Sequence, residues 1–243
     1  MMASCCLSVM DSMLDIIKWR RILNEGALAF NLQFSDKQIR LFYQHMTALI
    51  AWSHKTNLTA ISDPYEMAIK HFLDSVAPIR YCNAMSKVID IGSGAGFPGL
   101  PLKVWHPGIN LTMVDAVRKK VSFLKHVVRL MGIKNTQAIH MRVENLKPDP
   151  LNGTFDTIVC RAVGSLKSIV ECALPLMSKD GQLLIWKGHK PEKELQELRP
   201  VIDCPSNGLW LRMESYRLPV IEAQRTLVII GTQQKHPTPM SVS

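Results

Sequence analysis

The 243-residue sequence has six cysteines but no C-x-x-C pair, and their spacing fits no zinc site. It has no apolar run long enough to cross a bilayer, and its first residues lack the basic segment that opens a secretory signal peptide. These absences argue against a zinc module, a membrane-spanning protein and a disulfide-bonded secreted protein. We therefore expect a cytoplasmic protein without a metal ion, in which Cys160 and Cys172 are buried free thiols.

Acidic residues are the scarcer charge, with 20 Asp and Glu against 29 Lys and Arg, which gives a formal net charge of +9. This balance favours a polyanionic partner such as RNA or DNA, although many soluble proteins that bind no nucleic acid also have a positive net charge. The hydrophobic content of 47% is that of an ordinary globular protein with a sizeable core.

Glycine is absent between Gly26 and Gly92, and we expect residues 1–85 to form a helical extension or cap. Ser35 or Asp36 is placed to cap one helix. The apolar face of that helix is expected to contain Ile39, Phe42, Met46, Leu49 and Ile50. A second helix is predicted to begin at Asp63-Pro64-Tyr65-Glu66, which supplies a cap, an N1 proline and an N3 glutamate in order.

Short β-branched runs alternate with helical segments from Lys87 onward, which predicts a mostly parallel, doubly wound sheet over residues 86–232. The last two runs, residues 211–218 and 225–232, are joined by too few residues for a parallel crossover, so we expect them to pair antiparallel. The fold class is therefore Rossmann-like α/β with an antiparallel final strand. Residues 233–243 are predicted to be a flexible tail.

One helix of this region, in the stretch "AVRKKVSFLKHVVRLMG", is predicted to have a buried apolar stripe and a basic exposed face. The stripe is expected to contain Val117, Val121, Leu124, Val128 and Met131. The basic residues expected outside it are Arg118, Lys119, Lys125, His126 and Arg129. For this helix alone, a solvated face explains the basic residues better than direct contact with RNA.

The stretch "VIDIGSGAGFPGLPL" places several glycines between a strand and a helix, where a ligand can approach the bare backbone. It matches two cofactor motifs at once. Gly94-x-Gly96-x-x-Gly99 is the dinucleotide fingerprint. Asp90-x-Gly92-x-Gly94-x-Gly96 is the pattern of enzymes that use S-adenosylmethionine.

Asp90 favours the second motif because a carboxylate at the end of the strand would repel a pyrophosphate. The same carboxylate would suit the cationic ammonium and sulfonium groups of S-adenosylmethionine. Asp115 follows the next strand, where either cofactor needs an acid to hold its ribose diol. Two other function classes stay open at this point: an NAD(P)-dependent oxidoreductase, and a non-enzymatic RNA-binding or assembly factor on the same fold.

Four stretches, in this order, resemble the glucose-inhibited division protein B family, the ribosomal RNA small-subunit methyltransferases G. They are "WSHKTNLTAISDPYEMAIKHFLDS", "DIGSGAGFPGLPL", "MRVENL" and "CRAVGSL". The resemblance extends over residues 35–232. It implies an S-adenosylmethionine-dependent methyltransferase that makes 7-methylguanosine in 16S rRNA, with the rRNA or the small ribosomal subunit as its partner. A monomer is favoured.

The candidate site residues come from the motif and from the resemblance. The motif assigns Asp90, Gly94 and Gly96 to the cofactor. The resemblance implies further cofactor contacts from Gly92, Phe97, Asp115, Val143, Glu144 and Arg161.

Arg161 is also the expected substrate-positioning residue, at the end of a strand and within reach of an RNA phosphate or guanine O6. Lys187 is a second candidate at a strand end. We expect His71 to be structural rather than catalytic. No general base is required, because guanine N7 carries a lone pair and no proton.

Overall fold

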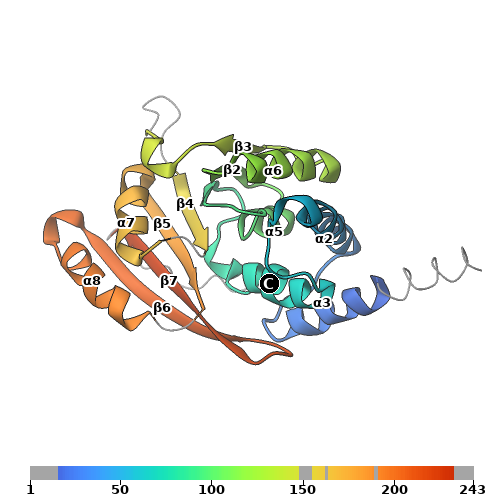
Figure 1. The fold of residues 1–243 in the computed structure, drawn as a ribbon. Coiled ribbons are helices and arrows are strands. Elements are labelled where there is room, and N and C mark those ends of the chain that lie inside the picture. Colours follow the sequence, from blue (N-terminus) through green and yellow to red (C-terminus); the bar gives the residue numbers. More distant parts are fainter. Residues whose placement is uncertain (1–15, 148–154, 162–163, 189–190, 233–243) are drawn as a thin grey trace, which may run out of the picture.

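The computed structural model describes residues 16–147, 155–161, 164–188 and 191–232 (Figure 1). Within these ranges the chain forms a seven-stranded sheet of order β3-β2-β1-β4-β5-β7-β6. The strands are β1 Lys87–Ile91, β2 Asn110–Asp115, β3 Thr136–His140, β4 Phe155–Arg161, β5 Met177–Lys187, β6 Leu209–Leu218 and β7 Ala223–Thr232. None of the helices in the described ranges is long and apolar enough to cross a membrane.

The first five strands are parallel, and β7 pairs antiparallel with both β5 and β6. The predicted α/β sheet with an antiparallel end is therefore confirmed. The antiparallel pairing of β6 with β7 follows from their short connection, because only the turn between Leu218 and Ala223 joins the two strands. The predicted tail, residues 233–243, lies outside the described residues.

Neighbouring side chains of the strands point to opposite faces of the sheet and enter two different clusters. Val88 packs in a cluster with residues of the helix at 16–28 and of α2, α5 and α6, whereas Ile89 packs with residues of α7 and α8. Figure 1 shows α7 and α8 beside the strands on one side, away from α2 and α6. The numbered helices are α2 Asp36–Thr56, α3 Pro64–Met67, α4 Asp74–Val76, α5 Gly99–Trp105, α6 Arg118–Met131, α7 Leu166–Ala173 and α8 Glu192–Ile202.

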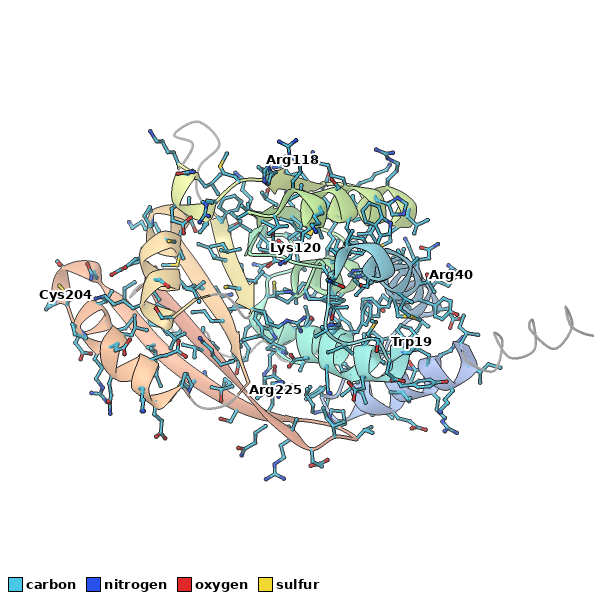
Figure 2. The ribbon with its side chains drawn as sticks, viewed as in Figure 1. Trp19, Arg40, Arg118, Lys120, Cys204 and Arg225 are labelled. Atoms are coloured by element: carbon cyan, nitrogen blue, oxygen red, sulfur yellow. The ribbon has the colours of Figure 1, made fainter. Side chains whose placement is uncertain are left out.

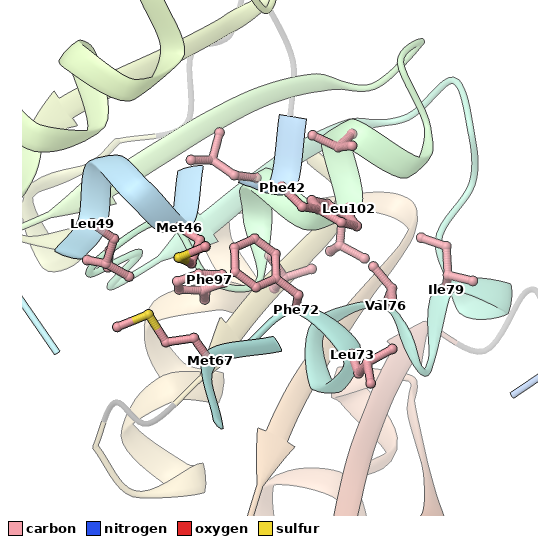
Figure 3. Close-up of a cluster of buried hydrophobic side chains, with 14 of the residues drawn as sticks. Phe42, Met46, Leu49, Met67, Phe72, Leu73, Val76, Ile79, Phe97 and Leu102 are labelled. Atoms are coloured by element: carbon pink, nitrogen blue, oxygen red, sulfur yellow. The ribbon is translucent and has the colours of Figure 1, made fainter. Parts of the chain in front are cut away.

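The N-terminal helices begin where the sequence predicts. Ser35 caps α2 in a capping box with Gln38, and the Asp63 carboxylate accepts a hydrogen bond from the Glu66 N–H at the start of α3. A π-helical stretch, residues 68–73, joins α3 to α4. Phe42 and Phe72 are fully buried in the cluster that also covers the sheet, close to Phe97 (Figure 3). The helical segment therefore shares its apolar core with this face of the sheet.

The expectation for α6 is wrong at Val117, whose exposed fraction is 40%. Val117 has extended backbone angles and precedes the helix, so its side chain does not lie on the helical face. Phe123 and Val127 complete the buried stripe instead. The five basic residues of the predicted outer face are exposed, as expected.

The two cysteines expected to be buried differ. Cys160 is fully buried in β4, which confirms the expectation there. Cys172 is only partly buried on α7, so the expectation is wrong for this thiol.

Candidate cofactor and substrate site

The glycine loop, residues 92–98, leaves the end of β1 through a series of positive φ angles. Gly92, Gly94 and Gly96 have φ of 68°, 58° and 93°, which side chains with a Cβ rarely adopt. A Cβ on Gly96 would lie 2.5 Å from Leu100 Cδ1, whereas one on Gly94 would meet nothing nearer than the Gly92 carbonyl oxygen at 3.9 Å. Gly96 is therefore required by packing as well as by backbone angle, and Gly94 borders open space.

Asp90, the acid of the motif, lies beneath the loop. Its carboxylate is fully buried, and Oδ2 accepts a hydrogen bond of 2.9 Å from the Gly99 N–H. A Cβ on Gly99 would lie 2.6 Å from that oxygen, so the glycine makes room for the acid. Oδ1 has no hydrogen-bond partner among the described residues. Burial raises the pKa of Asp90 to about 7, against the opposing effects of the Gly99 N–H and the Arg161 charge.

Asp115, at the end of β2, is hydrogen-bonded to the backbone of the glycine loop. Its two oxygens accept hydrogen bonds from the backbone N–H groups of Gly94, at 2.9 Å, and Val117, at 2.8 Å. The ammonium group of Lys120 lies 4.0 Å away. Asp115 thus connects the glycine loop to the residues that follow the end of β2.

A cavity of about 360 Å³ lies between the glycine loop, the end of β2 and the N-terminal helical segment. Its lining residues are Leu58, Thr59, His71, Gly92, Ser93, Gly94, Ala95, Phe97, Asp115, Ala116, Lys120 and Arg161. Five of the predicted site residues therefore share one cavity: Gly92, Gly94, Phe97, Asp115 and Arg161. A larger cavity of about 700 Å³ is lined by residues 29–32, 77–81 and 214–217, and none of the glycine loop.

Four predicted site residues do not line the 360 Å³ cavity. Asp90 and Gly96 lie behind its wall, where they shape the loop. Val143 and Glu144 lie in a short 3-10 turn, residues 143–145, after β3.

The donor set fits S-adenosylmethionine. The space beside Gly94 allows a ligand to approach the backbone, and Asp115 presents a carboxylate at the cavity wall. The cavity volume lies within the range of about 300–1,000 Å³ that small-molecule sites occupy. The described residues contain no group of three or more His, Cys, Asp or Glu side chains arranged to hold a metal ion.

Arg161 ends β4 and is held by the N-terminal helical segment. Nη1 donates to the Lys70 carbonyl at 3.2 Å and to Asp74 Oδ2 at 3.3 Å, and Nη2 donates to His71 Nδ1 at 3.1 Å. The guanidinium carbon lies 5.2 Å from the centre of the Phe97 ring, and the side chain is 15% exposed. Arg161 is therefore a paired residue of the cavity wall rather than a solvated charge.

Asp74 connects Arg161 to the antiparallel end of the sheet. The Tyr216 hydroxyl donates to Asp74 Oδ1 at 2.8 Å, and Arg225 Nε lies 3.5 Å from the same oxygen. Burial raises the pKa of Asp74, while the charge of Arg161 is the largest of the effects that lower it. The network joins the N-terminal helices, β4, β6 and β7 around one buried carboxylate.

His71, which the sequence predicts to be structural rather than catalytic, lies in the cavity wall. Its ring stacks on Phe97, with centroids 4.5 Å apart and planes inclined by 17°, and Nε2 lies 3.0 Å from Thr59 Oγ1. Burial, followed by the charge of Arg161, lowers the pKa of His71 to about 3, so the ring is neutral. The sequence carried one usable signal, because His71 and Asp74 are three residues apart on a predicted helix and so lie on one side of it.

Lys187 does end β5 as predicted, but its ammonium group is 2.8 Å from Glu194. The same carboxylate accepts a hydrogen bond from the Leu166 N–H, also at 2.8 Å. Lys187 therefore connects β5 to helices α7 and α8, and it does not line the cavity.

Comparison with known proteins places this site in a family. A family model described as rRNA small subunit methyltransferase G matches residues 38–208. The ribosomal RNA small subunit methyltransferase G of Geobacter sulfurreducens is 40% identical over 212 residues, which are 87% of this chain and 96% of that protein. The protein of the same name from Lactococcus lactis subsp. lactis is 36% identical and covers 86% of this chain and 88% of its own length.

Solved structures support the fold. The magnesium protoporphyrin IX methyltransferase of Synechocystis, solved with bound S-adenosylmethionine, aligns with a TM-score of 0.56 and 12% identity, over 77% of this chain and 97% of that one. A methyltransferase of Aquifex aeolicus aligns with a TM-score of 0.54 and 16% identity, over 73% and 98% of the two chains. The fold is thus that of S-adenosylmethionine-dependent methyltransferases, and, with the family match and the two relatives, the chain belongs to the rRNA small subunit methyltransferase G family.

Proposed function

We propose that the protein transfers a methyl group from S-adenosylmethionine to N7 of a guanine in 16S rRNA, in the cytoplasm. The observation that carries this proposal is one cavity lined by the glycine loop and Asp115 together with Thr59, His71 and Arg161. The loop backbone and Asp115 suit a nucleoside cofactor, and Thr59, His71 and Arg161 suit a base. Methylation of small-subunit rRNA is also the activity for which the family is named.

On the cofactor side, the backbone of Gly92 and Gly94 and the carboxylate of Asp115 would hold S-adenosylmethionine. Val143 and Glu144 are the residues proposed for its adenine, because their turn follows β3, which pairs with β2. When bound, the cofactor supplies an electrophilic methyl group. Asp90 supports the loop from below, through the Gly99 N–H, and does not line the cavity.

On the substrate side, the residues orient the base and do not take a proton from it. Guanine N7 has an accessible lone pair, so alignment is the main requirement, and alignment can account for up to ~7–11 kcal/mol of a barrier. The purine gains positive charge as the methyl group is transferred. A neutral His71 avoids placing a second cation beside it, and Arg161 fixes His71 and Phe97 in position.

A basic surface beside the cavity is proposed to contact RNA phosphates. Lys120 lines the cavity and Arg118 lies at the start of the same helix, α6 (Figure 2). Lys119, Lys125 and Arg129 are exposed on α6. Such a surface predicts that RNA affinity falls as salt rises, because bound counterions are released from the polyanion.

The dinucleotide reading of the loop finds no support in the geometry. Its last glycine, Gly99, is explained by the Asp90 carboxylate, which occupies the space that a side chain would take. The literal match to a dinucleotide fingerprint is therefore a coincidence of glycine spacing.

The test compares rRNA from cells with and without the gene, with 7-methylguanosine mapped by chemical cleavage. We expect one guanine of 16S rRNA to lose its modification in the deletion strain and to regain it when the gene is restored. The purified protein should then methylate deproteinised 16S rRNA or small subunits, and comparing these two substrates identifies the physiological one. An unchanged modification map, together with binding of NADH but not of S-adenosylhomocysteine, would refute the proposal.

A further inference from the structure

A directed chain of hydrogen bonds runs from Arg161 to the cavity. Arginine can only donate, so His71 Nδ1, at 3.1 Å from Arg161 Nη2, is the acceptor. The neutral ring consequently carries its proton on Nε2. That N–H donates to Thr59 Oγ1 at 3.0 Å.

Thr59 Oγ1 receives a second hydrogen bond from the Ile61 N–H at 3.1 Å. A hydroxyl oxygen has two lone pairs, and both are now used. The remaining function of this hydroxyl is to donate its own hydrogen, for which the described residues provide no acceptor. Thr59 lines the cavity, so the donor is available to a ligand there.

Arg161 begins the chain with a cation, and successive hydrogen bonds polarise one another. The Thr59 hydroxyl is therefore a better donor than an isolated threonine. The Ile61 N–H and the His71 ring also fix the position of the oxygen. The result is one oriented donor in the wall of the cavity that the glycine loop also lines.

We propose that the Thr59 hydroxyl donates to O6 of the target guanine and is a specificity-determining residue of the methyl transfer. This proposal rests on the function proposed above. Guanine presents N7 and O6 side by side as acceptors on one edge, whereas adenine presents N7 beside an N6 amino group that donates. Because both lone pairs of Thr59 Oγ1 are used, this hydroxyl accepts no hydrogen bond from adenine, and the site favours guanine.

The experiment uses the full chain and 16S rRNA, both deproteinised and in small subunits, that carries guanine, inosine or 2-aminopurine at the target position. Inosine keeps O6, whereas 2-aminopurine keeps N7 and lacks O6. Methyl transfer from labelled S-adenosylmethionine is measured as kcat/KM for the wild type, Thr59→Val and Thr59→Ser. Affinity for S-adenosylhomocysteine is measured on each variant.

We expect Thr59→Val to lower kcat/KM on guanine and inosine by about tenfold, the effect of one hydrogen bond with an uncharged donor. On 2-aminopurine, the wild type and Thr59→Val should be equally slow, because the acceptor is already missing. Thr59→Ser keeps the hydroxyl and should keep the preference for guanine. Affinity for S-adenosylhomocysteine should be unchanged in all three proteins.

A purely structural role would slow Thr59→Val by the same factor on all three bases, and that result would overturn the inference. Weaker S-adenosylhomocysteine binding by Thr59→Val would also overturn it, because the hydroxyl would then serve the cofactor. If Thr59→Val does not fold, Thr59→Ala gives the same ratio of guanine to 2-aminopurine activity in a different packing context. A wild type that methylates guanine and 2-aminopurine equally well refutes the inference alone. A wild type that methylates neither refutes the proposed function.

Discussion

Asp90 and Asp115 lie at the ends of two neighbouring parallel strands, yet their carboxylates differ in hydrogen bonding and in access to the cavity. Asp90 is covered on every side and has one oxygen without a partner among the described residues. Asp115 is also largely buried, but each of its oxygens accepts a backbone N–H and it borders the cavity. Burial therefore costs Asp90 the hydration of one oxygen without a replacement hydrogen bond, whereas both oxygens of Asp115 are hydrogen-bonded.

The difference comes from position in the sheet. β1 lies between β2 and β4, and the glycine loop and the start of α5 cover the Asp90 side chain. β2 ends beside the loop rather than beneath it, so Asp115 meets the loop backbone and the cavity at once. Two identical side chains at the ends of neighbouring strands can therefore have separate roles: Asp90 supports the loop from beneath, and Asp115 binds its backbone at the edge.

The largest expected effect is on stability at Asp90. Its pKa is about 7 in the folded protein against an ordinary value of 3.8, so the native state binds more protons between these pH values. The folded protein should therefore lose up to about 4 kcal/mol of stability, relative to Asp90→Asn, as pH rises from 4 to 7. Urea unfolding of the cofactor-free proteins at several pH values checks this. A stability difference that does not change with pH would show that folding does not raise the pKa of Asp90.

The next effect concerns Arg161, the cation whose charge acts on Asp90. Arg161→Ala should lose about 3 kcal/mol of stability, because Asp74 remains buried with one cation fewer. It should also lose methyl transfer far more than S-adenosylhomocysteine affinity, and Arg161→Lys should rescue only in part because lysine lacks the planar fork. Arg225→Ala is the matched control, because it also removes a cation beside Asp74, but Arg225 does not line the cavity. Equal losses of methyl transfer in Arg161→Ala and Arg225→Ala would show that Arg161 acts only through Asp74 and does not position the substrate.

Asp115→Ala should weaken binding of S-adenosylhomocysteine by about 1–3 kcal/mol, through loss of charge-assisted hydrogen bonds at the cavity wall. Asp115→Asn keeps an acceptor oxygen for one backbone N–H and should fall between wild type and alanine. Calorimetric titration gives both values. If Asp90→Asn weakened binding more than Asp115→Ala did, the assignment of the two acids would be reversed.

The smallest expected change in stability is at Gly94, whose N–H joins the loop to Asp115. A side chain there meets open space, so Gly94→Ala should cost only about 1–2 kcal/mol, the strain of a left-handed backbone. Gly94→Val should still fold and should not bind S-adenosylhomocysteine, because the side chain projects where the cofactor is proposed to lie. Thermal unfolding and calorimetry measure the two effects, and normal binding by Gly94→Val would exclude this part of the loop from the cofactor site.

The parts of the fold that depend on local patterns were predicted from the sequence. The caps at Ser35 and Asp63, the alternating strands and helices, and the antiparallel pairing of the last two strands follow from spacing and residue type. Val117 was misplaced because a period of 3.6 residues does not show where the helix begins. The roles of Val143 and Glu144 remain predictions, since these residues lie outside the cavity.

The order of the elements, the glycine loop and the acids at the ends of β1 and β2 can all be predicted from residue order alone. Local backbone preferences and the order of the motifs are encoded in neighbouring residues. Tertiary contacts alone bring His71 and Thr59, which lie before β1, to the same cavity as the glycine loop, and pair Arg161 with Asp74. Burial, charge pairing and hydrogen-bond direction depend on side chains far apart in the chain, such as Asp74 and Tyr216, which are 142 positions apart, and no local pattern specifies such contacts.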